Sequence, residues 1–543
     1  MDRTARVALL QLPAYAIEDA AASLDHTLGA IDRAARERPD IIVMPEMTYP
    51  AYLLGSSDLS GLQTSPADAL ERFAGRARRH RVYIAAGLAL DDGRGGHVNA
   101  AALLDRNGAL AGRYAKSFLW HFDSKWFTPG DAYPIFETDV ARVGMLVCAD
   151  ARVPEIPRAL ALAGAQIILD LTAWVSGARH EQDLTSAQRE YIIQARAIEN
   201  GVWIAAADKF GVEAESIVYC GGSCVINPRG EYVASLGAAE EGVLTYDIPV
   251  QDPAPPITRR PELYDVLAHP TESLPVIRTL DEESALPSRQ HNIAVVQMTM
   301  PRTGAAFLAA ARRHATRLAL QDAELVLFPA TPGRLRTAYP HDEVLAGMLA
   351  LSSETGLCLA FTVSRPDADG QRAMYLLGPR GVIAVHAQSH RPPGPRFETM
   401  PLGDTPCPVA STPVGRVGLI AAAEGFVPEV ARSLVLRGAE ILLWASDTPG
   451  ASAELIARCR ADENRVYVAA AAAPAAGASI IVDPSGRTLA IALRDRELAV
   501  SADVNPLLSH VKRRAPGTDV IRDRRPATYA PLLRASPVPE RVV

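Results

Sequence analysis

Three residues with reactive or charged side chains follow short apolar runs in the first half of this sequence. Glu46 follows Ile-Ile-Val-Met-Pro, Lys116 follows Leu-Ala-Gly-Arg-Tyr-Ala, and Cys148 follows Val-Gly-Met-Leu-Val. Together they offer a thiol nucleophile, a carboxylate that can take its proton, and an ammonium that can stabilise an oxyanion. The set is suited to nucleophilic catalysis if the fold brings the three side chains together.

The surrounding pattern predicts the elements that would hold these residues. Short Val/Ile/Leu runs, such as 81–86 and 167–171, alternate with amphipathic stretches such as 67–79 and 186–200. This alternation indicates strands buried by helices, which is an α/β layered architecture. Because ligands gather at the carboxyl ends of strands in open α/β sheets, we expect the three residues to converge on one crevice.

An internal repeat organises the whole chain. The run Val-Ala-Leu-Leu-Gln at 7–11 reappears as Ile-Ala-Val-Val-Gln at 293–297. The run Asn-Pro-Arg-Gly at 227–230 reappears as Asp-Pro-Ser-Gly at 483–486. Other matching runs lie between these two, and they occur in the same order in both halves of the chain. Self-similarity of this kind identifies a tandem duplication.

The repeat also sets the expected domain boundaries. A chain of 543 residues is long enough for at least two cores, at roughly 100–200 residues per domain. We predict a catalytic domain over 1–270, a linker over 271–290, a second domain over 291–535 and a tail over 536–543.

The second copy lacks the three catalytic groups. Transfer of the spacing places Ala330, Ser389 and Ala422 at the positions of the glutamate, the lysine and the cysteine. The cysteines of the second copy lie at other positions, namely Cys358, Cys407 and Cys459. We therefore predict that the second domain is catalytically inactive and has a structural role.

Further motifs accompany the three residues of the first copy. Glu46 is preceded by Pro, the cysteine opens the run Cys-Ala-Asp-Ala-Arg-Val-Pro-Glu at 148–155, and Trp-Phe-Thr-Pro-Gly occupies 126–130. With Arg-Ala-Ile-Glu-Asn-Gly at 196–201, this pattern resembles the nitrilase superfamily, the carbon–nitrogen hydrolases, over essentially all of domain one. The resemblance implies an α/β fold with two tandem four-layer αββα sandwiches.

Subunits of this family generally pair through helices on one face of the sandwich. The resemblance therefore implies that domain two supplies such a surface to domain one, as an intrachain pseudo-dimer. The alternative is two loosely tethered domains that each pair elsewhere, and assembly into further homo-oligomers stays open.

The resemblance also implies a mechanism. Cys148 would attack an amide carbonyl after Glu46 accepts its proton, and Lys116 with backbone N–H groups after the cysteine would stabilise the oxyanion. A turn that feeds a helix, together with the lysine charge, is expected to favour the thiolate of Cys148. No metal or organic cofactor is needed for this chemistry.

One position departs from the family pattern. Members commonly carry a second glutamate four residues before the aromatic residue of the Phe-x-Pro-Gly segment, and this chain has Asp123 there. A carboxylate is retained on a side chain that is one methylene shorter. We expect Asp123 to act as a supporting residue of the site, against the alternative of a solvated loop charge.

The residues around the cysteine bear on the substrate. Relatives that hydrolyse nitriles usually have Trp-Glu directly after the cysteine, whereas this chain has Ala149 followed by Asp. That difference favours linear amides or N-carbamoyl compounds over nitriles. By family position Trp174, Tyr52 and Ala149 are expected to bind substrate, and the alternative for the two aromatic side chains is that they belong to the core. Arg152 is expected either to meet a substrate carboxylate or to form a structural ion pair.

Two other readings of the chain stay open. The same catalytic residues could transfer the acyl group to an amine instead of water, and a non-catalytic scaffold or metabolite-binding protein could retain the pocket. The intact catalytic residues of domain one argue against the second reading, because drift removed all three in the sister copy.

Composition excludes several classes of protein. The chain has 55 Lys and Arg against 62 Asp and Glu, a net charge of −7, which argues against a nucleic-acid partner. No apolar run is long enough for a membrane segment. Six cysteines in this length argue for a reducing cytoplasm, and Cys220 and Cys224 have no second ligand pair nearby that would indicate zinc.

Overall fold

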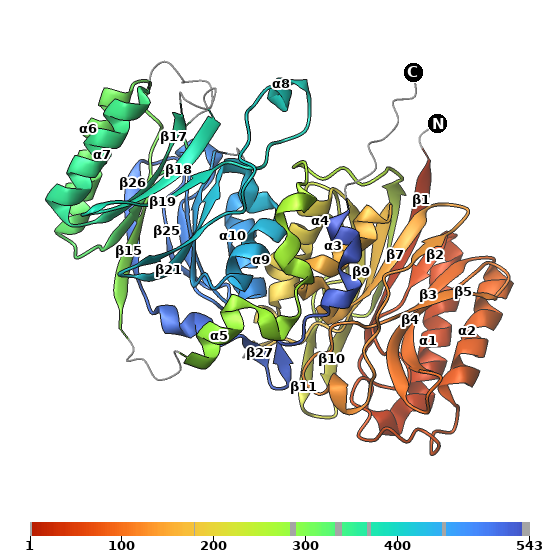
Figure 1. Cartoon of the computed structure of the whole chain (residues 1–543). Coiled ribbons are helices and arrows are strands. Elements are labelled where there is room, and N and C mark those ends of the chain that lie inside the picture. Colours follow the sequence, from red (N-terminus) through yellow and green to blue (C-terminus); the bar gives the residue numbers. More distant parts are fainter. Residues whose placement is uncertain are drawn as a thin grey trace. The chain divides into compact units, whose positions relative to one another are not determined.

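The computed structural model describes residues 3–178, 180–282, 289–331, 339–365, 371–447 and 452–534 (Figure 1). The chain forms two compact units. The first comprises Met1–Pro255 and Ala515–Thr518, and the second comprises Pro256–Arg514 and Asp519–Val543. The predicted α/β class, with two tandem domains of mixed sheets flanked by helices, is confirmed.

The units do not divide where the repeat does. Residues from Pro256 onward pack with the second unit, including the short 3₁₀ helices Pro261–Leu263 and Asp265–Ala268 and the helix α5 (Pro275–Glu282). Part of the predicted linker is therefore helical, residues 283–288 lie outside the described part of the chain, and so does the predicted tail over 536–543.

The first unit contains two mixed sheets. One has the order β11-β10-β1-β2-β3-β4-β5 with β14 paired to β1, and the other has the order β13-β12-β9-β8-β7-β6. The strands of the first sheet are β1 (Thr4–Pro13), β2 (Ile41–Val43), β3 (Tyr83–Asp91), β4 (His97–Leu104), β5 (Leu110–Ala115), β10 (Lys209–Glu213), β11 (Ile217–Cys220) and β14 (Gly242–Pro249). Those of the second are β6 (Ile135–Glu137), β7 (Arg142–Val147), β8 (Ile167–Leu171), β9 (Trp203–Ala207), β12 (Cys224–Ile226) and β13 (Tyr232–Ser235).

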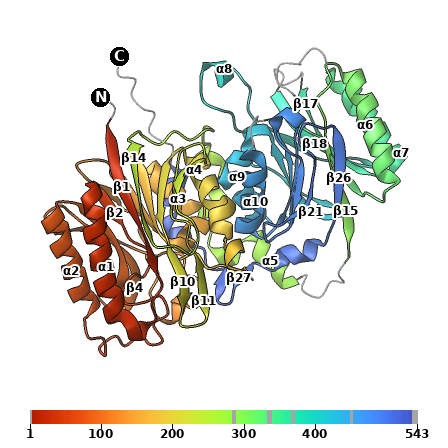
Figure 2. The same cartoon turned by 180° about the vertical axis from the view of Figure 1, so that it is seen from behind.

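The two sheets of the first unit pack face to face between two pairs of helices (Figures 1 and 2). The helices are α1 (Ala20–Ala34), α2 (Pro66–His80), α3 (Glu155–Leu162) and α4 (Ile193–Asn200). Alternation along β1 shows the layering, because Ala8 and Leu10 pack in the core that includes α1 and α2, whereas Val7 and Leu9 pack against the second sheet. This arrangement is the expected αββα sandwich.

Local sequence explains the boundaries of α2. The Ser65 hydroxyl accepts the Asp68 backbone N–H at 3.1 Å, Pro66 takes the first helical position, and Arg81 ends the helix with a left-handed backbone. The helix covers the predicted stretch 67–79 with one extra residue at each end.

The second unit repeats the same plan. Its first sheet has the order β19-β18-β17-β16-β15-β26, and its second has the order β20-β21-β22-β23-β24-β25. The strands of the first sheet are β15 (His291–Gln297), β16 (Leu325–Leu327), β17 (Cys358–Arg365), β18 (Gln371–Gly378), β19 (Gly381–Ala387) and β26 (Leu498–Val504). Those of the second are β20 (Val409–Thr412), β21 (Gly415–Ala421), β22 (Ile441–Ala445), β23 (Tyr467–Ala471), β24 (Ile480–Val482) and β25 (Thr488–Ile491).

Helices also cover both sheets of the second unit. The covering helices are α6 (Gly304–Ala319), α7 (His341–Thr355), α9 (Pro428–Leu436) and α10 (Ser452–Asn464), whereas the short α8 (Pro395–Glu398) lies on a projecting loop (Figure 1). A small separate pair of strands is formed by β27 (Arg513–Ala515) and β28 (Thr518–Asp519). One core lies beneath α6 and α7, and another lies between the two sheets. Both copies therefore bury the same two faces of each sheet.

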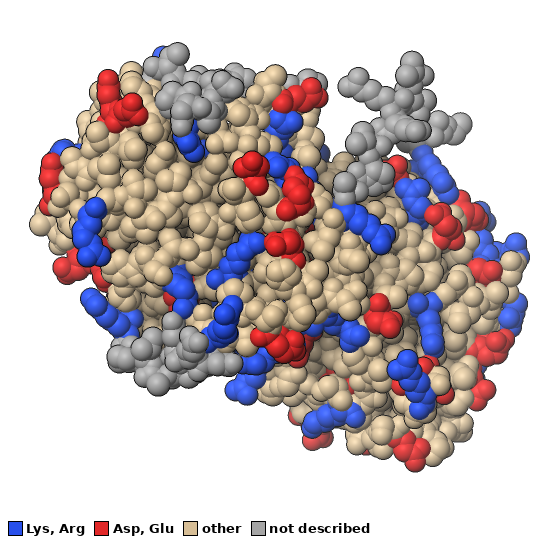
Figure 3. Space-filling model, in the orientation of Figure 1, with Lys and Arg blue, Asp and Glu red and all other residues tan. Residues whose placement is uncertain are grey.

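The surface carries charges of both signs. On the face in Figure 3, Lys and Arg side chains are interspersed with Asp and Glu among the described residues. Among those residues, no helix is both long and apolar enough to cross a membrane.

Candidate active site

Glu46, Lys116 and Cys148 follow β2, β5 and β7 of the first unit. The Lys116 Nζ atom donates a hydrogen bond to Glu46 Oε1 at 2.7 Å, and both side chains are fully buried. The Cys148 thiol lies in the electrostatic field of these two groups. The structure thus brings the three predicted residues together at the strand ends.

A glycine on the neighbouring strand lets the glutamate reach this position. A Cβ atom at Gly87 would lie 2.1 Å from the Pro45 carbonyl oxygen, so β3 approaches the turn after β2 more closely than a side chain allows. The Glu46 N–H donates to the Thr172 carbonyl at 3.2 Å, and the Thr48 N–H donates to the Gly87 carbonyl at 2.8 Å. The backbone around Glu46 is therefore held by β3 and by the residue that follows β8.

The Phe-x-Pro-Gly segment fixes the backbone of the lysine. The Gly130 N–H donates to the Lys116 carbonyl at 2.8 Å, and the Lys116 N–H donates to the Asn99 carbonyl at 2.8 Å. A Cβ atom at Gly130 would lie 2.2 Å from the Ala115 carbonyl oxygen. This motif therefore works by close backbone packing beside Lys116.

Asp123 joins the same cluster. Its Oδ2 atom accepts from Lys116 Nζ at 2.6 Å and from the Trp120 N–H at 2.9 Å, and its side chain is fully buried. The structure thus places Asp123 against Lys116, so the shorter side chain still reaches the lysine. The ammonium is held between two carboxylates.

Asn99 is a site residue that the sequence analysis missed. Its Nδ2 atom donates to Glu46 Oε1 at 2.7 Å, on the same oxygen that Lys116 contacts. The other carboxylate oxygen, Glu46 Oε2, is buried without a hydrogen-bond partner. This free oxygen is a ready proton acceptor, and Asn99 helps to hold it in place.

Cys148 stands at a sharp turn. It has a positive φ of 47° and opens the 3₁₀ helix Cys148–Arg152 directly after β7. The Asp150 carboxylate accepts from the N–H groups of Val147, Ser117 and Phe118 at 3.1, 3.1 and 2.8 Å. Asp150 therefore ties the cysteine turn to the loop that follows the lysine.

Several groups surround the sulfur. Cys148 Sγ is 3.7 Å from the Ala173 carbonyl oxygen, to which the thiol donates, and it accepts from Gln188 Nε2 at 3.5 Å. The Cys148 N–H donates to Asp170 Oδ1 at 3.1 Å. Cys148 keeps 8% of its surface exposed while Glu46 and Lys116 have none, so the cysteine is the most accessible of the three residues.

Gln188 was also missed by the sequence analysis. It begins a π-helical turn, Gln188–Ile192, ahead of α4, and this irregular turn within the predicted helix is a common feature of functional sites. Its Oε1 atom is buried without a partner. Because the hydrophobic pattern of a helix does not predict a single π-helical turn, the sequence did not indicate this position of Gln188.

Burial sets the protonation of the resting site. It raises the pKa of the Cys148 thiol well above its usual range, Glu46 raises it further, and Lys116 offsets part of the effect. The expected resting thiolate is therefore wrong, because desolvation of the sulfur outweighs the lysine charge. Burial likewise raises the pKa of Glu46, although Lys116 works against the shift. For Lys116, burial would lower the pKa, but Asp123 and Glu46 raise it, so the ammonium stays charged.

Two of the predicted substrate-binding side chains lie close to the catalytic cluster. The Lys116 Nζ atom is 5.7 Å from the centre of the Tyr52 ring, which also packs on Phe122 and Tyr219. Ala149 directly follows the nucleophile and is buried. Both therefore contribute to the wall around the reacting atoms.

Trp174 lies in the loop after β8, and Arg152 lies at the end of the 3₁₀ helix that Cys148 opens. Trp174 is buried, and its backbone N–H donates to Asp208 Oδ1 at 2.8 Å. The Arg152 guanidinium lies 4.6 Å above the Trp120 ring. Arg152 thus packs on an aromatic ring, and its expected contact with a substrate carboxylate stays a prediction.

A segment remote in sequence touches the loop that carries Asp123. The His121 N–H donates to Thr518 Oγ1 at 2.7 Å, and that hydroxyl donates to the Leu119 carbonyl at 3.4 Å. Thr518 belongs to the short stretch Ala515–Thr518, which is part of the first unit. A residue near the end of the second repeat therefore braces this loop.

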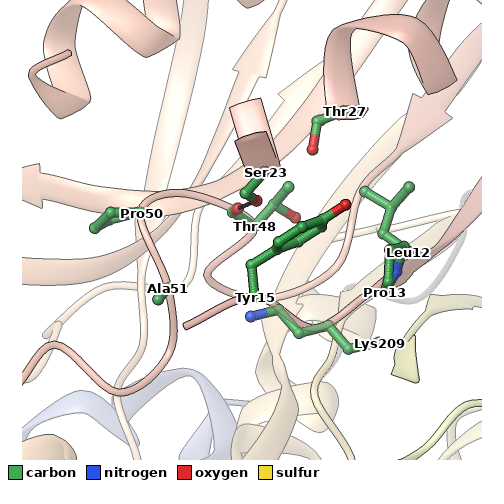
Figure 4. Close-up of a pocket in the computed structure, with 9 residues that line it drawn as sticks. All are labelled: Leu12, Pro13, Tyr15, Ser23, Thr27, Thr48, Pro50, Ala51 and Lys209. Atoms are coloured by element: carbon green, nitrogen blue, oxygen red, sulfur yellow. Dashed lines mark hydrogen bonds between the residues drawn. The ribbon is translucent and has the colours of Figure 1, made fainter. Parts of the chain in front are cut away.

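A small pocket lies beside the segment that follows Glu46 (Figure 4). In it, Ser23 donates a hydrogen bond to the Thr48 carbonyl beside the Tyr15 ring, and Lys209 Nζ donates to the Met47 carbonyl at 2.8 Å. None of the three catalytic side chains lines this pocket. Ser23 and Lys209 therefore stabilise the backbone of the two residues that follow Glu46.

Backbone pairing identifies the corresponding positions of the second unit. Ala330 and Ala422 stand where expected, because the Ala330 N–H donates to the Ser446 carbonyl and Ala422 has a φ of 53° at the start of a 3₁₀ helix. The lysine position differs from the prediction. The Gln388 N–H donates to the Arg372 carbonyl, as the Lys116 N–H does to Asn99.

The predicted Ser389 is thus one residue too far along the chain. Five residues lie between the paired Leu104 and Leu110 of the first unit, whereas four lie between Leu377 and Val382 of the second. The tighter hairpin shifts the count, so Gln388 occupies the lysine position. The conclusion that no lysine stands there is unchanged.

Comparison with known proteins gives consistent results. The family model described as "Carbon-nitrogen hydrolase" matches residues 6–254 and 292–512. A protein of Pseudomonas protegens named "Hydrolase in pqqF 5'region" is 33% identical over 277 residues, covering 49% of this chain and 93% of that protein. An omega-amidase of Bos taurus is 28% identical over 284 residues, covering 49% of this chain and 98% of its own.

Two amidases are further matches. An (R)-stereoselective amidase of a Pseudomonas species is 29% identical over 223 residues, covering 41% of this chain and 77% of its own. The crystal structure of an amidase from a Nesterenkonia species matches with 29% identity and a TM-score of 0.41, covering 46% of this chain and 92% of that one.

Proposed function

Because the chain belongs to the carbon–nitrogen hydrolase family, we propose that its first domain hydrolyses the C–N bond of small linear amides or N-carbamoyl compounds. The observation that carries the proposal is the buried Lys116 ammonium, hydrogen-bonded to Glu46 and Asp123 beside the strained turn of Cys148. The family membership expected from the residue pattern is confirmed by the match to both halves of the chain.

The first step is attack on the carbonyl carbon. Glu46 Oε2, which has no partner at rest, takes the thiol proton as the sulfur forms its bond to carbon. The carbonyl electron pair moves onto oxygen, and Lys116 Nζ and the Ala149 N–H donate to that oxyanion. A neutral resting thiol fits this step, because the proton moves only when substrate is present.

The second step breaks the C–N bond. The oxyanion collapses, the leaving nitrogen takes the proton from Glu46, and ammonia or an amine departs while the acyl group stays on Cys148 as a thioester. Glu46 then takes a proton from water, the hydroxide attacks the thioester carbonyl, and the proton returns to the sulfur as the acid leaves. Each proton that Glu46 accepts is given back, so the cycle balances.

Two observations support amides and carbamoyl compounds over nitriles. The relatives named above include an omega-amidase and a stereoselective amidase. Ala149 and Asp150 follow the cysteine, and the Asp150 carboxylate is fully engaged by backbone N–H groups and the Tyr114 hydroxyl. We propose that Tyr52 and Trp174 shape the pocket, which requires a small acyl group because the site is enclosed.

The test is a panel of linear amides, N-carbamoyl amino acids and nitriles, with ammonia release measured on the full chain. We expect turnover of at least one amide or carbamoyl compound, and its loss in Cys148→Ala by about 10⁴-fold or more in kcat. Cys358→Ala, a buried cysteine of the second unit, is the matched control and should keep activity. Identical rates in wild type and Cys148→Ala would defeat the proposal. Product appearing only when an amine is added would identify acyl transfer instead.

We also propose that the second domain is inactive and that it pairs with the first through helices on one face of each sandwich. The inactivity is supported by the residues at the three catalytic positions, because none of Ala330, Gln388 and Ala422 can act as base, cation or nucleophile. A crystal structure of the full chain with the two sandwiches apart would contradict the pairing.

A further inference from the structure

A second cluster of reactive side chains lies in the second unit, away from the proposed active site. His386 Nε2 is 3.4 Å from Cys407 Sγ and 2.8 Å from Glu424 Oε2, and all three side chains are buried. One ligand atom from each residue lies within 4.8 Å of the other two. An imidazole, a thiol and a carboxylate in this arrangement are a ligand set for a transition metal.

The first unit shows what these positions hold in the sister copy. Register along the paired strands aligns His386 with Tyr114, and alignment of β20 with β6 places Cys407 at the position of Tyr133. Glu424 takes the place of Asp150. The first copy therefore has two phenols and a carboxylate where the second has imidazole, thiol and carboxylate.

Both phenols of the first unit are thus replaced in the second unit by side chains that commonly bind metals. In the first unit the Tyr114 hydroxyl donates to Asp150 at 2.7 Å, and three backbone N–H groups donate to the same buried carboxylate. A histidine alone would preserve that contact in the second unit. The added thiol of Cys407 contributes nothing to it, yet it faces the same imidazole nitrogen.

The distances fit a tetrahedral ion. Bonds of about 2.0–2.1 Å to nitrogen and about 2.3 Å to sulfur place the two atoms about 3.6 Å apart at a tetrahedral angle. The structure has Sγ and Nε2 at 3.4 Å. The imidazole and carboxylate, now 2.8 Å apart, must separate by about 0.5 Å to bind the same tetrahedral ion.

Neighbouring groups already orient the carboxylate. The Ala421 N–H donates to Glu424 Oε2 at 2.7 Å, and the Ser389 N–H and hydroxyl donate to Glu424 Oε1 at 2.6 and 2.8 Å. The Ser389 hydroxyl is also hydrogen-bonded to His390 Nδ1 at 2.8 Å. Outer hydrogen bonds of this kind hold ligands at established metal sites.

A small pocket lies beside the cluster. It is lined by Cys407, Ser389, His390 and Tyr264 among others, all within the second unit. The pocket has room for about one water molecule, which could serve as a fourth ligand beside the sulfur.

We propose that His386, Cys407 and Glu424 form a binding site for a divalent transition metal ion, zinc above all, in the second unit. The ion would bind imidazole Nε2, the thiolate and a carboxylate oxygen, while the thiol proton and the Nε2 proton leave to solvent. The thiolate excludes magnesium and calcium, which prefer oxygen ligands. This site is independent of the proposed hydrolysis.

The test uses the full chain carrying Cys148→Ala, so that the first-unit thiol takes no part. The protein is stripped with a chelator, and zinc is titrated against a chromophoric competitor. We expect one ion per chain, with affinity lost by more than about 100-fold in Cys407→Ser, beyond the 10–100-fold cost of changing an outer group. Cys459→Ser, another buried cysteine of the second unit, is the matched control and should bind as before.

Cobalt gives a second readout. Co²⁺ bound at the site should show a thiolate-to-metal charge-transfer band that Cys407→Ser abolishes and Cys459→Ser retains. Cys407→Tyr, which restores the residue type of the first unit, should also lose the band. Zinc binding that Cys407→Ser leaves unchanged, or cobalt binding without the band, would overturn the proposal.

A third measurement needs no variant at Cys407 and covers the case in which those variants fail to fold. Alkylation of the stripped chain is followed by mass spectrometry with and without zinc. We expect zinc to slow modification of Cys407 at least tenfold and to leave Cys358 unchanged. Equal rates at Cys407 would show that the cluster is held by hydrogen bonds alone.

Discussion

The turns at Cys148 and Ala422 make the clearest comparison between the two units. Both residues have positive φ, at 47° and 53°, and both open a 3₁₀ helix after a buried parallel strand. In each, a carboxylate two residues later accepts the N–H of the residue before the turn. The backbone that presents a nucleophile is thus complete in both units, and only one of them has the nucleophile.

The second turn keeps its strained backbone without a catalytic reason. A left-handed conformation costs a non-glycine residue roughly 1–2 kcal/mol. Packing maintains it at Ala422, because the Trp444 indole N–H donates to the Ala422 carbonyl at 2.7 Å and the ring fills the space beside Gly425. The first unit has Asp170 at the Trp444 position. The same turn therefore forms without the catalytic residues, whereas the catalytic residues depend on the turn for their position.

The glutamate position changed together with its neighbour. Gly87 leaves room for the turn that carries Glu46, whereas the equivalent position of the second unit is Thr362. Its hydroxyl accepts the Thr331 N–H at 2.7 Å. In the second unit the Thr362 side chain therefore fills the space that Gly87 leaves open in the first. The second unit lacks both this open space and the carboxylate of the first unit, since Ala330 replaces Glu46.

The largest difference between the units should appear at the lysine position. Lys116→Met removes the cation that faces the oxyanion and leaves Glu46 and Asp123 buried without it. We expect kcat to fall by about 10³-fold. Steady-state kinetics on the best amide of the panel measures this.

Gln388→Met is the matched change in the second unit and should alter kcat less than twofold. A loss comparable to that of Lys116→Met would mean that the second unit takes part in the chemistry. Thermal unfolding of both variants separates a catalytic loss from a folding defect.

A smaller effect is expected at Asp123, which contacts the lysine but not the sulfur. Asp123→Asn keeps the size of the side chain and removes one of the two negative charges on Lys116. We expect kcat to fall about 10- to 100-fold with KM nearly unchanged, since an ammonium held less firmly stabilises the oxyanion less well. A rise in KM alone would assign Asp123 to substrate binding instead.

Asn99→Leu should move the acid limb of the pH profile. Glu46 must be ionised to accept the thiol proton, so kcat/KM falls as the pH drops through its pKa, which burial has raised above the usual range of about 4.3. The Asn99 N–H favours the ionised form. Its removal raises this pKa further and shifts the limb to higher pH. A limb that stays in place, or moves to lower pH, would show that Glu46 does not set it.

The smallest effect is expected at Thr518, which joins the end of the second repeat to the first unit. Thr518→Ala removes the acceptor of the His121 N–H, a hydrogen bond whose loss costs about 0.5–1.5 kcal/mol. We expect kcat to fall about 2- to 10-fold because the Asp123 loop is held less firmly. Ser509→Ala, in the same C-terminal part of the chain, should have no effect on kcat. Equal kinetics for wild type and Thr518→Ala would show that the loop is held without this residue.

Much of this arrangement could be predicted from the sequence. Apolar runs that end at Glu46, Lys116 and Cys148 indicate strand ends, and the repeat indicates two sandwiches, because both signals are local or periodic. Asp123 could be placed through a fixed spacing to the Phe-x-Pro-Gly segment. These features depend on order along the chain, which sequence shows directly.

Other features depend on how strands meet, which the sequence does not show. Asn99 reaches Glu46 from β4 because of the register of β4 with β3, and a hairpin that is one residue shorter places Gln388 instead of Ser389 at the lysine position. Thr518 is close to His121 only through the fold. The resting thiol of Cys148 follows from the depth of burial, so the lysine charge alone gave the wrong expectation.

The central claim is that one unit carries the chemistry and that Cys148 is its nucleophile. The most direct test is mass spectrometry of the full chain after brief mixing with a turned-over amide and acid quenching, followed by digestion and peptide mapping. We expect one acyl group per chain, on the peptide that contains Cys148, and none on the peptides of Cys358, Cys407 or Cys459. An acyl group on a cysteine of the second unit, or full turnover by Cys148→Ala, would contradict it.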